Sequence, residues 1–376
     1  MRWLERPGRR AVGLVMAALA LTSCGRGGSD DGASGSREAT YKQVVEDPHP
    51  RPADVIEAAG APYGVARAGD GSLLLTYEAD NVEDDEGPAA AAWRIVGPDG
   101  RTVAEHAEHT NAEDTRAVFK GAPKGFVRVP SGEGAEGAYT LDLRGRRHQV
   151  VVDETPLGSR AGDILLGEWE PVLVHRPATR TVAPLSGVPD GAARLALDER
   201  GTVWSLDQSL TEESADRVVW QRDGRTLGTK AVPEPYTGGV LAARGGTVAL
   251  SLTQGDKERG LLVTADDGGH RRTVLDGGIP WKDLEGGPDA LVLEPLEDGR
   301  LLVGEAGGRY WLADDPTNNA FHQLETPATL TSLTVHGTTL YGITDATTPS
   351  YDLVKDEGLW ISRDGGRAWR AYTPSP

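Results

Sequence analysis

The stretch YGVARAGDGSLLLTYE, residues 63–78, contains two short apolar strands joined by the turn Gly69-Asp70-Gly71. An Asp-Gly turn between apolar runs is the strongest local signal for a β-hairpin. Similar units recur at residues 116–129, 193–207, 240–252, 291–306 and 330–345. One hairpin repeated along most of the chain indicates a repeat architecture.

A second hairpin follows these units, at residues 93–105, 139–152, 218–232, 260–275, 309–324 and 358–372. An inner and an outer hairpin together make one four-stranded sheet. The turn glycines Gly71 and Gly337 lie 266 residues apart, and six steps of about 44 residues match the length of a propeller blade. We therefore predict an all-β fold, a β-propeller of four-stranded blades.

A weaker seventh unit lies in residues 158–190, where 163–168, 171–175 and 180–185 supply three short apolar segments. Seven blades fit the sequence best, and six or eight are alternatives. A β-sandwich is the other architecture open to an all-β chain, but it does not by itself produce inner and outer hairpins in alternation. No long 3.6-residue apolar period appears in residues 48–376, so no helical domain is expected.

The composition excludes several classes of function. The 376 residues include 57 Asp and Glu against 39 Lys and Arg, a net charge of −18, and a chain this acidic is not expected to bind nucleic acid. One cysteine excludes a disulfide framework and a thiolate zinc cluster. No P-loop, dinucleotide fingerprint or Gly-x-Ser-x-Gly elbow is present. We expect no cofactor.

The N-terminus has the pattern of a secretion signal. Arginines in residues 1–10 precede the apolar stretch 11–21, which is too short for a stable membrane-spanning helix. Leu21-Thr-Ser-Cys24 resembles a bacterial lipobox, which implies lipid modification of Cys24. We predict a signal peptide at 1–23, a lipidated Cys24 with a flexible polar linker over 24–47, and a propeller domain over 48–376.

Lipidation would place the protein on the cell membrane, at its extracytoplasmic face, with the membrane as a partner through the lipid anchor. Several acyl chains hold a protein stably where one chain holds it only marginally. The Arg9-Arg10 pair leaves both the general secretory route and twin-arginine export open. Oligomeric state is not fixed by the sequence.

Near the C-terminus, Ser362, Asp364, Gly366 and Trp369 closely resemble the Asp-box, Ser-x-Asp-x-Gly-x-x-Trp, of sialidases and other BNR-repeat propellers. In a tight turn the Asp carboxylate accepts main-chain amides, Gly supplies a positive φ and Trp covers the turn. The resemblance implies a structural turn between the third and fourth strands of a blade. Thr264, Asp266 and Gly268 form a degenerate copy, with Arg271 where Trp would stand.

The same family gives a test for catalysis. Sialidases carry a Phe/Tyr-Arg-Ile-Pro motif early in the first blade, and its Arg clamps the sugar carboxylate. Here Gly64 stands in place of that Arg, and Arg67, an odd number of residues away, is expected on the opposite face of the strand. We assign no catalytic residue.

The leading hypothesis is a binding or scaffold module with a carbohydrate or protein ligand at a face of the propeller. A sialidase-like glycoside hydrolase or lyase on the same propeller is the alternative. Convergent arginines or paired carboxylates around the axis would favour the enzyme, and an apolar or acidic rim would favour binding.

Two polar clusters are weak metal candidates. The acidic run over residues 80–86, around Asp84, could hold calcium but lacks the spaced pattern of a calcium loop. His106 and His109 fall in what reads as an exposed connection and lack zinc-protease spacing. We expect no metal site.

The tryptophans have two expected roles. Trp281, in a connection between blades, is the surface candidate for ligand contact. Five others are predicted to pack between blades: Trp93, Trp220, Trp311, Trp360 and Trp369.

Overall fold

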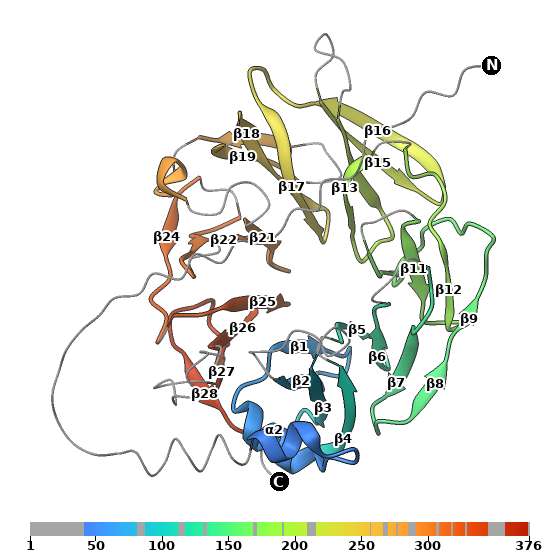
Figure 1. The fold of residues 1–376 in the computed structure, drawn as a ribbon. Coiled ribbons are helices and arrows are strands. Elements are labelled where there is room, and N and C mark those ends of the chain that lie inside the picture. Colours follow the sequence, from blue (N-terminus) through green and yellow to red (C-terminus); the bar gives the residue numbers. More distant parts are fainter. Residues whose placement is uncertain are drawn as a thin grey trace, which may run out of the picture.

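The chain forms a ring of seven four-stranded sheets (Figure 1), so the predicted seven-bladed propeller is confirmed. The computed structural model describes residues 41–80, 87–111, 117–130, 134–167, 171–189, 192–208, 216–255, 257–265, 270–275, 277–284, 291–305, 308–316, 319–327, 329–344 and 358–374. The signal peptide, Cys24 and the linker up to residue 40 lie outside these residues, as does the acidic run over 81–86.

The blades follow one another along the chain. The first contains β1 (Gly64–Arg67), β2 (Leu73–Asp80), β3 (Pro88–Val96) and β4 (Thr102–Asn111). The second contains β5 (Phe119–Ala122), β6 (Gly125–Arg128), β7 (Tyr139–Asp142) and β8 (Arg147–Gln149). The third contains β9 (Val151–Val152), β10 (Ile164–Leu165), β11 (Leu173–Arg176) and β12 (Thr181–Pro184).

The remaining four blades are regular antiparallel meanders. The fourth contains β13 (Ala192–Leu197), β14 (Val203–Asp207), β15 (Arg217–Arg222) and β16 (Arg225–Ala231). The fifth contains β17 (Thr237–Arg244), β18 (Thr247–Gln254), β19 (Lys257–Ala265) and β20 (His270–Val274). The sixth contains β21 (Val292–Pro295), β22 (Leu301–Gly304), β23 (Tyr310–Ala313) and β24 (Phe321–Gln323), and the seventh contains β25 (Ser332–His336), β26 (Thr339–Thr344), β27 (Gly358–Ser362) and β28 (Arg370–Tyr372).

Aspartates shape the tight turns between inner strands. The Asp70 carboxylate accepts hydrogen bonds from the Ser72 amide (2.9 Å) and hydroxyl (3.0 Å), and the next residue, Gly71, has φ 94°. Asp298 accepts the Arg300 amide at 3.1 Å in the equivalent turn of the sixth blade. The carboxylate satisfies a turn amide while glycine takes a φ that other residues avoid, which is why Asp-Gly marked these hairpins in the sequence.

The third blade departs from the pattern. Its outermost strand, β9, runs parallel to β12, and the Val151 amide donates to the Arg180 carbonyl at 2.8 Å. The hairpin pattern predicts residues 151–152 in the outer hairpin of the second blade, and that prediction is wrong. The chain leaves β8 and continues along the rim into the next sheet, where β9 and β12 exchange main-chain hydrogen bonds (Figure 1).

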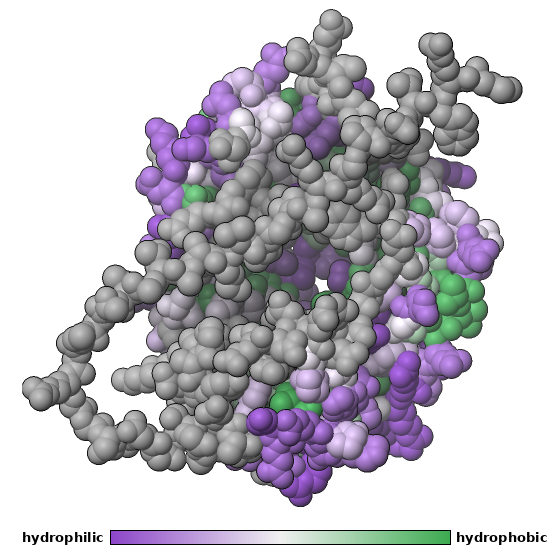
Figure 2. Space-filling model, viewed as in Figure 1, coloured by the Kyte–Doolittle hydropathy of each residue, from purple (hydrophilic) through white to green (hydrophobic). Residues whose placement is uncertain are grey.

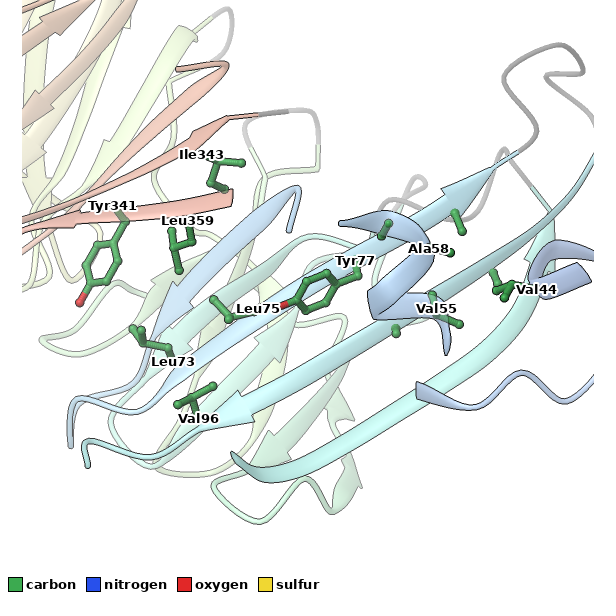
Figure 3. Packing of buried hydrophobic residues seen from close by; sticks show 14 of the residues in the cluster. Val44, Val55, Ala58, Leu73, Leu75, Tyr77, Val96, Tyr341, Ile343 and Leu359 are labelled. Carbon is green, nitrogen blue, oxygen red and sulfur yellow. The ribbon is translucent and has the colours of Figure 1, made fainter. Parts of the chain in front are cut away.

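The ring closes without a shared strand. The first blade is built wholly from the N-terminal part of the described chain and the seventh wholly from the C-terminal part. Their facing side chains form one apolar cluster in which Leu73, Leu75, Tyr341, Ile343 and Leu359 are each at most 5% exposed (Figure 3). Closure therefore rests on the burial of apolar surface between the two sheets.

Two short helices cover the outer part of the first blade. Residues 41–46 are helical, and α2 (Pro52–Ala59) starts with Pro at its first turn and ends at Gly60, φ 74°. Val44 and Val45 are 6% and 4% exposed and pack with Val55 of α2 on the first blade. The packed chain thus includes residues that the sequence analysis counted with the linker.

Trp281 corrects a second expectation. It is 6% exposed, begins the 3-10 turn η2 (Trp281–Asp283) and lies in the core of the fifth and sixth blades, so it is not a surface ligand contact. Of the five tryptophans expected between blades, Trp93 and Trp311 are buried, while Trp220, Trp360 and Trp369 are partly buried against the apolar cores between blades.

Among the described residues no helix is long and apolar enough to cross a membrane.

Candidate functional site

The Asp-box residues form a hydrogen-bonded turn between β27 and β28. Asp364 accepts the Ala368 amide at 3.0 Å and the Ser362 hydroxyl at 2.8 Å, and the Gly366 amide donates to the same hydroxyl oxygen at 2.7 Å. The amide of Ala368, then the Ser362 hydroxyl, hold the pKa of Asp364 below its usual value. Gly366 has φ 88°, and Trp369 packs partly buried against the core of the sixth and seventh blades.

The degenerate copy is only partly described. Thr264 lies near the end of β19, as Ser362 ends β27, but its buried hydroxyl has no partner among the described residues. Asp266 and Gly268 lie outside those residues.

The histidine pair does not make a metal site. His106 and His109 lie on β4 rather than in an exposed connection, which corrects the sequence analysis, and three residues apart along a strand they face opposite sides. The His106 ring lies tilted by 34° against the Trp93 ring (centroids 5.5 Å apart), and His106 Nε2 lies 3.9 Å from the Glu108 carboxylate. In the described part of the chain no group of three or more His, Cys, Asp or Glu could hold a metal ion.

Gly64 lies on β1, the inner strand, opposite Thr76 of β2. A Cβ at position 64 would lie 2.6 Å from the Thr76 hydroxyl, so a larger residue there needs that hydroxyl to move. On the same strand Val65 packs toward the seventh blade and Ala66 toward the second, so Arg67 faces away from the side of Gly64. The expected orientation of Arg67 is confirmed.

Charged side chains crowd one end of the central channel. The Arg244 guanidinium reaches from β17 to the Val335 carbonyl, 3.3 Å from each terminal nitrogen, and its Nε lies 3.2 Å from Glu199. Burial raises the pKa of Glu294, which the charges of Arg244 and Lys120 counteract. Figure 2 shows the ring hollowed near its axis. Because Arg244 is engaged on both sides, this cluster braces the channel more than it offers a site.

Burial also lowers the pKa of His336, which lies at the same end of the channel. Burial, and then the charges of Arg244 and Arg67, lower the pKa of His336 to about 4. Its ring meets Tyr341 edge to face, with centroids 5.6 Å apart. The imidazole is therefore neutral near pH 7 and belongs to the interface that closes the ring.

A cleft opens between the second and third blades, where the fold is irregular. Its volume is about 800 Å³, which suits a small ligand or a segment of an oligomer. One wall comes from the β5–β6 turn, β7 and His148 of β8; the other comes from residues 160–163 and from His175 to Arg180. The cleft exists because the third blade has short inner strands and takes its outer strand from the preceding connection.

An ion pair fixes the wall contributed by the third blade. Asp163 accepts Arg176 Nε at 3.0 Å and Nη2 at 2.7 Å, and it also accepts the Arg160 amide at 2.9 Å. The side chains of Arg176 and Asp163 are 12% and 2% exposed. Arg176 Nη2 also donates to the Gly158 carbonyl at 2.6 Å. The bidentate pair is thus a rigid part of the cleft with little charge left to offer a ligand.

Two histidines lie in opposite walls of the cleft. His175, 1% exposed, has Nδ1 3.2 Å from the Thr181 carbonyl, so Nδ1 carries the proton and Nε2 is an acceptor in the neutral ring. Burial lowers the pKa of His175, against the Thr181 hydrogen bond and the charge of Asp163. His148 Nε2 lies 3.3 Å from an oxygen of Asp142.

Three exposed cations lie on the cleft: Lys124, Arg160 and Arg180. Within the described part of the chain their charged groups make no hydrogen bond or ion pair. None of the three is a candidate site residue on the sequence alone. Each belongs to a polar turn that reads as a solvated connection, and only the weakness of the seventh repeat signalled that this region is irregular.

No known protein family matches this sequence, and no curated protein matches it. Among solved structures, the β-propeller domain of the Trilobed protease from Pyrococcus furiosus has a TM-score of 0.50 at 11% identity, with 83% of this chain and 95% of that chain covered. This likeness shows the propeller fold alone.

Two further structures are similar to this chain at lower scores. BamB from Moraxella catarrhalis has a TM-score of 0.38 at 14% identity, with 75% of this chain and 81% of that chain covered. A puromycin-hydrolysing peptidase from Mycobacterium tuberculosis has a TM-score of 0.48 at 15% identity, with 88% of this chain covered. The chain spans about half, 56%, of that peptidase.

Proposed function

We propose that this protein is a lipid-anchored, extracytoplasmic binding module whose ligand site is the cleft between the second and third blades. The observation that supports a binding role is the cleft itself, about 800 Å³ in volume and lined by apolar residues of two blades with charged and polar side chains among them. Concave sites with a few fixed polar groups are the usual form of a ligand site. A carbohydrate or a protein segment is the class of ligand that we propose.

The enzyme alternative has less support. A sialidase-like hydrolase or lyase needs a guanidinium where the family's first-blade motif has Arg, and position 64 has no side chain. The guanidinium of Arg244 near the axis is engaged by Val335 and Glu199. We therefore favour binding without chemical conversion of the ligand.

The cleft is tested by filling it. Ala178 is exposed and lines the cleft, so Ala178→Trp places an indole in the site without disturbing the core. We expect the labelled full chain to bind at least one component of an array of cell-wall glycans and immobilised peptides, and Ala178→Trp to abolish that binding. Ala231→Trp, at an exposed position of β16, is the matched control and should bind normally. Equal binding by all three proteins would refute the cleft as the site.

The anchor is tested separately, because Cys24 is the single thiol of the chain. Cys24→Ser should move the protein from the membrane to the soluble fraction and abolish incorporation of labelled fatty acid. A Cys24→Ser protein that stays as membrane-bound as the wild type would contradict the lipoprotein assignment.

A further inference from the structure

The charge of the cleft is opposite to that of the protein. The chain as a whole carries −18, whereas the cleft is lined by Lys124, Arg160, Arg176 and Arg180 against two carboxylates. Since Asp163 already neutralises Arg176, the other three cations give the rim a local positive field. In a protein with so many acidic side chains, three unpaired cations on one cleft indicate an anionic ligand.

The walls also offer acceptors. His175 lines the cleft with 1% of its surface exposed, and its Nε2 is an acceptor in the neutral ring, since Nδ1 donates to the Thr181 carbonyl. The Asp142 carboxylate accepts hydrogen bonds from the amides of Arg144 and Arg146, each at 2.9 Å, and one of its oxygens lies 3.3 Å from His148 Nε2. These three contacts use three of the about four lone-pair directions of a carboxylate, so one remains for a ligand. A ligand with hydroxyl groups could donate to these acceptors. A ligand with charge alone would meet repulsion from Asp142.

We propose that the cleft binds a polyhydroxylated anion, whose phosphate or carboxylate groups contact Lys124, Arg160 and Arg180 and whose hydroxyl groups donate to Asp142 and His175. This rests on the proposed function, because it names the ligand of the same cleft. An acidic peptide would satisfy the cations but would leave the two acceptors without side-chain donors.

The backbone of Arg180 makes it the position at which binding and stability can be tested separately. Arg180 has φ 55° in the turn between β11 and β12, a conformation that costs a non-glycine residue free energy. The same positive φ occurs at only one other non-glycine position among the described residues, Asp223 (φ 50°). Glycine would fit the Arg180 turn better, because it takes this φ without strain.

This strain separates binding from stability in one variant. Arg180→Gly should keep or raise the midpoint of thermal unfolding, because glycine relieves the turn while the main-chain bond from Val151 to the Arg180 carbonyl stays. It should weaken binding of an anionic probe about tenfold, since one charge-assisted contact is lost. A purely structural arginine would lose stability together with binding.

Asp223→Gly is the matched control. It relieves a turn with a similar φ and changes the charge in the opposite sense, so it should keep the thermal midpoint and bind the probe at least as tightly as the wild type. The variant with Lys124, Arg160 and Arg180 all changed to neutral residues should lose affinity about 1000-fold if the three contacts are independent and each contributes about tenfold.

The probes for calorimetry with the full chain in detergent are inositol 1,4,5-trisphosphate, which keeps three free hydroxyl groups, tetragalacturonate, neutral myo-inositol and octaglutamate. We expect one or both hydroxylated anions to bind, myo-inositol not to bind, and octaglutamate to bind more weakly. Which of the two hydroxylated anions binds more tightly shows whether the cleft prefers phosphate or carboxylate groups. Tighter binding of octaglutamate would favour an acidic peptide and overturn the proposal, as would failure of both hydroxylated anions to bind.

The two hypotheses fail differently. If Ala178→Trp abolishes ligand binding on the array but Arg180→Gly binds its probe as tightly as the wild type, the cleft remains the site and the anion assignment is wrong. If Ala178→Trp leaves binding of the array component unchanged, the proposed function itself fails.

Discussion

The interface that closes the ring and the interface between the second and third blades are built in different ways. At the closing interface, side chains from the first and seventh blades pack as one apolar cluster (Figure 3). At the other, the two sheets leave a cleft of about 800 Å³, in which charged groups and histidines stand among apolar lining residues. Where every blade repeats the same pattern, packing fills the space between sheets, and where one blade departs from it, room for a ligand remains.

The largest expected effect comes from the ion pair in the cleft wall. Asp163→Ala leaves Arg176, 12% exposed, without its carboxylate and the Arg160 amide without an acceptor. Removing one partner of a buried pair costs about 3–5 kcal/mol of unfolding free energy. Urea unfolding of the wild type and the variant measures this.

A second substitution shows whether the loss of stability in Asp163→Ala comes from the uncompensated charge of Arg176. Asp163→Ala combined with Arg176→Met should be more stable than Asp163→Ala alone, because no uncompensated charge remains. If Asp163→Ala costs less than about 1 kcal/mol, charge does not hold this wall and the contrast between the interfaces fails.

Acid should weaken the closing interface next. His336 has a pKa of about 4 in the folded protein against 6.5 for the free side chain. Between these two pH values the unfolded chain binds a proton at His336 and the folded chain does not. The stability from neutral His336 is complete above pH 6.5 and falls as the pH falls toward 4. A shift of this size corresponds to about 3 kcal/mol.

The measurement is the urea midpoint of the wild type and His336→Gln between pH 7.5 and pH 4. The difference in unfolding free energy between the two should change with pH by up to about 3 kcal/mol, in the sense that the wild type loses more on acidification. His49→Gln, at an exposed position, is the control and should follow the wild type. Parallel curves for wild type and His336→Gln would mean that His336 titrates normally.

Much of the fold could be predicted because its signals are local. Asp70-Gly71 and Asp298-Gly299 form their turns from neighbouring residues, and each hairpin carries its own apolar strands. The pairing of β9 with β12 is not local: Val151 bonds to a residue far along the chain, and nothing in its own sequence shows which sheet it joins. Trp281 was misjudged for a similar reason, since tertiary packing buries a residue from a Gly- and Pro-rich connection.

The candidate site was the least predictable part. Lys124, Arg160 and Arg180 come from three separate turns, and each turn alone reads as an ordinary solvated loop. Only the third blade's departure from the repeat brings them onto one cleft. A weak repeat within a clear series is therefore a useful signal for a site, although it does not indicate which side chains form it.

The smallest of these effects concerns Trp369 in the Asp-box of the seventh blade. The family resemblance implied a ring that covers the turn. The structure places Trp369 partly buried against the core of the sixth and seventh blades, with a buried indole nitrogen that has no hydrogen-bond partner among the described residues. Truncating a fully buried Trp costs about 3–5 kcal/mol, and a partly exposed ring should cost about half of that, near 2 kcal/mol. Trp369→Ala should therefore lower the urea midpoint modestly and leave probe binding in the distant cleft unchanged, whereas Trp369→Phe should keep most of the packing. If Trp369→Ala is fully folded but no longer binds the probe, the seventh blade and the cleft between the second and third blades are coupled. The contrast between the regular interface and the cleft would then be wrong.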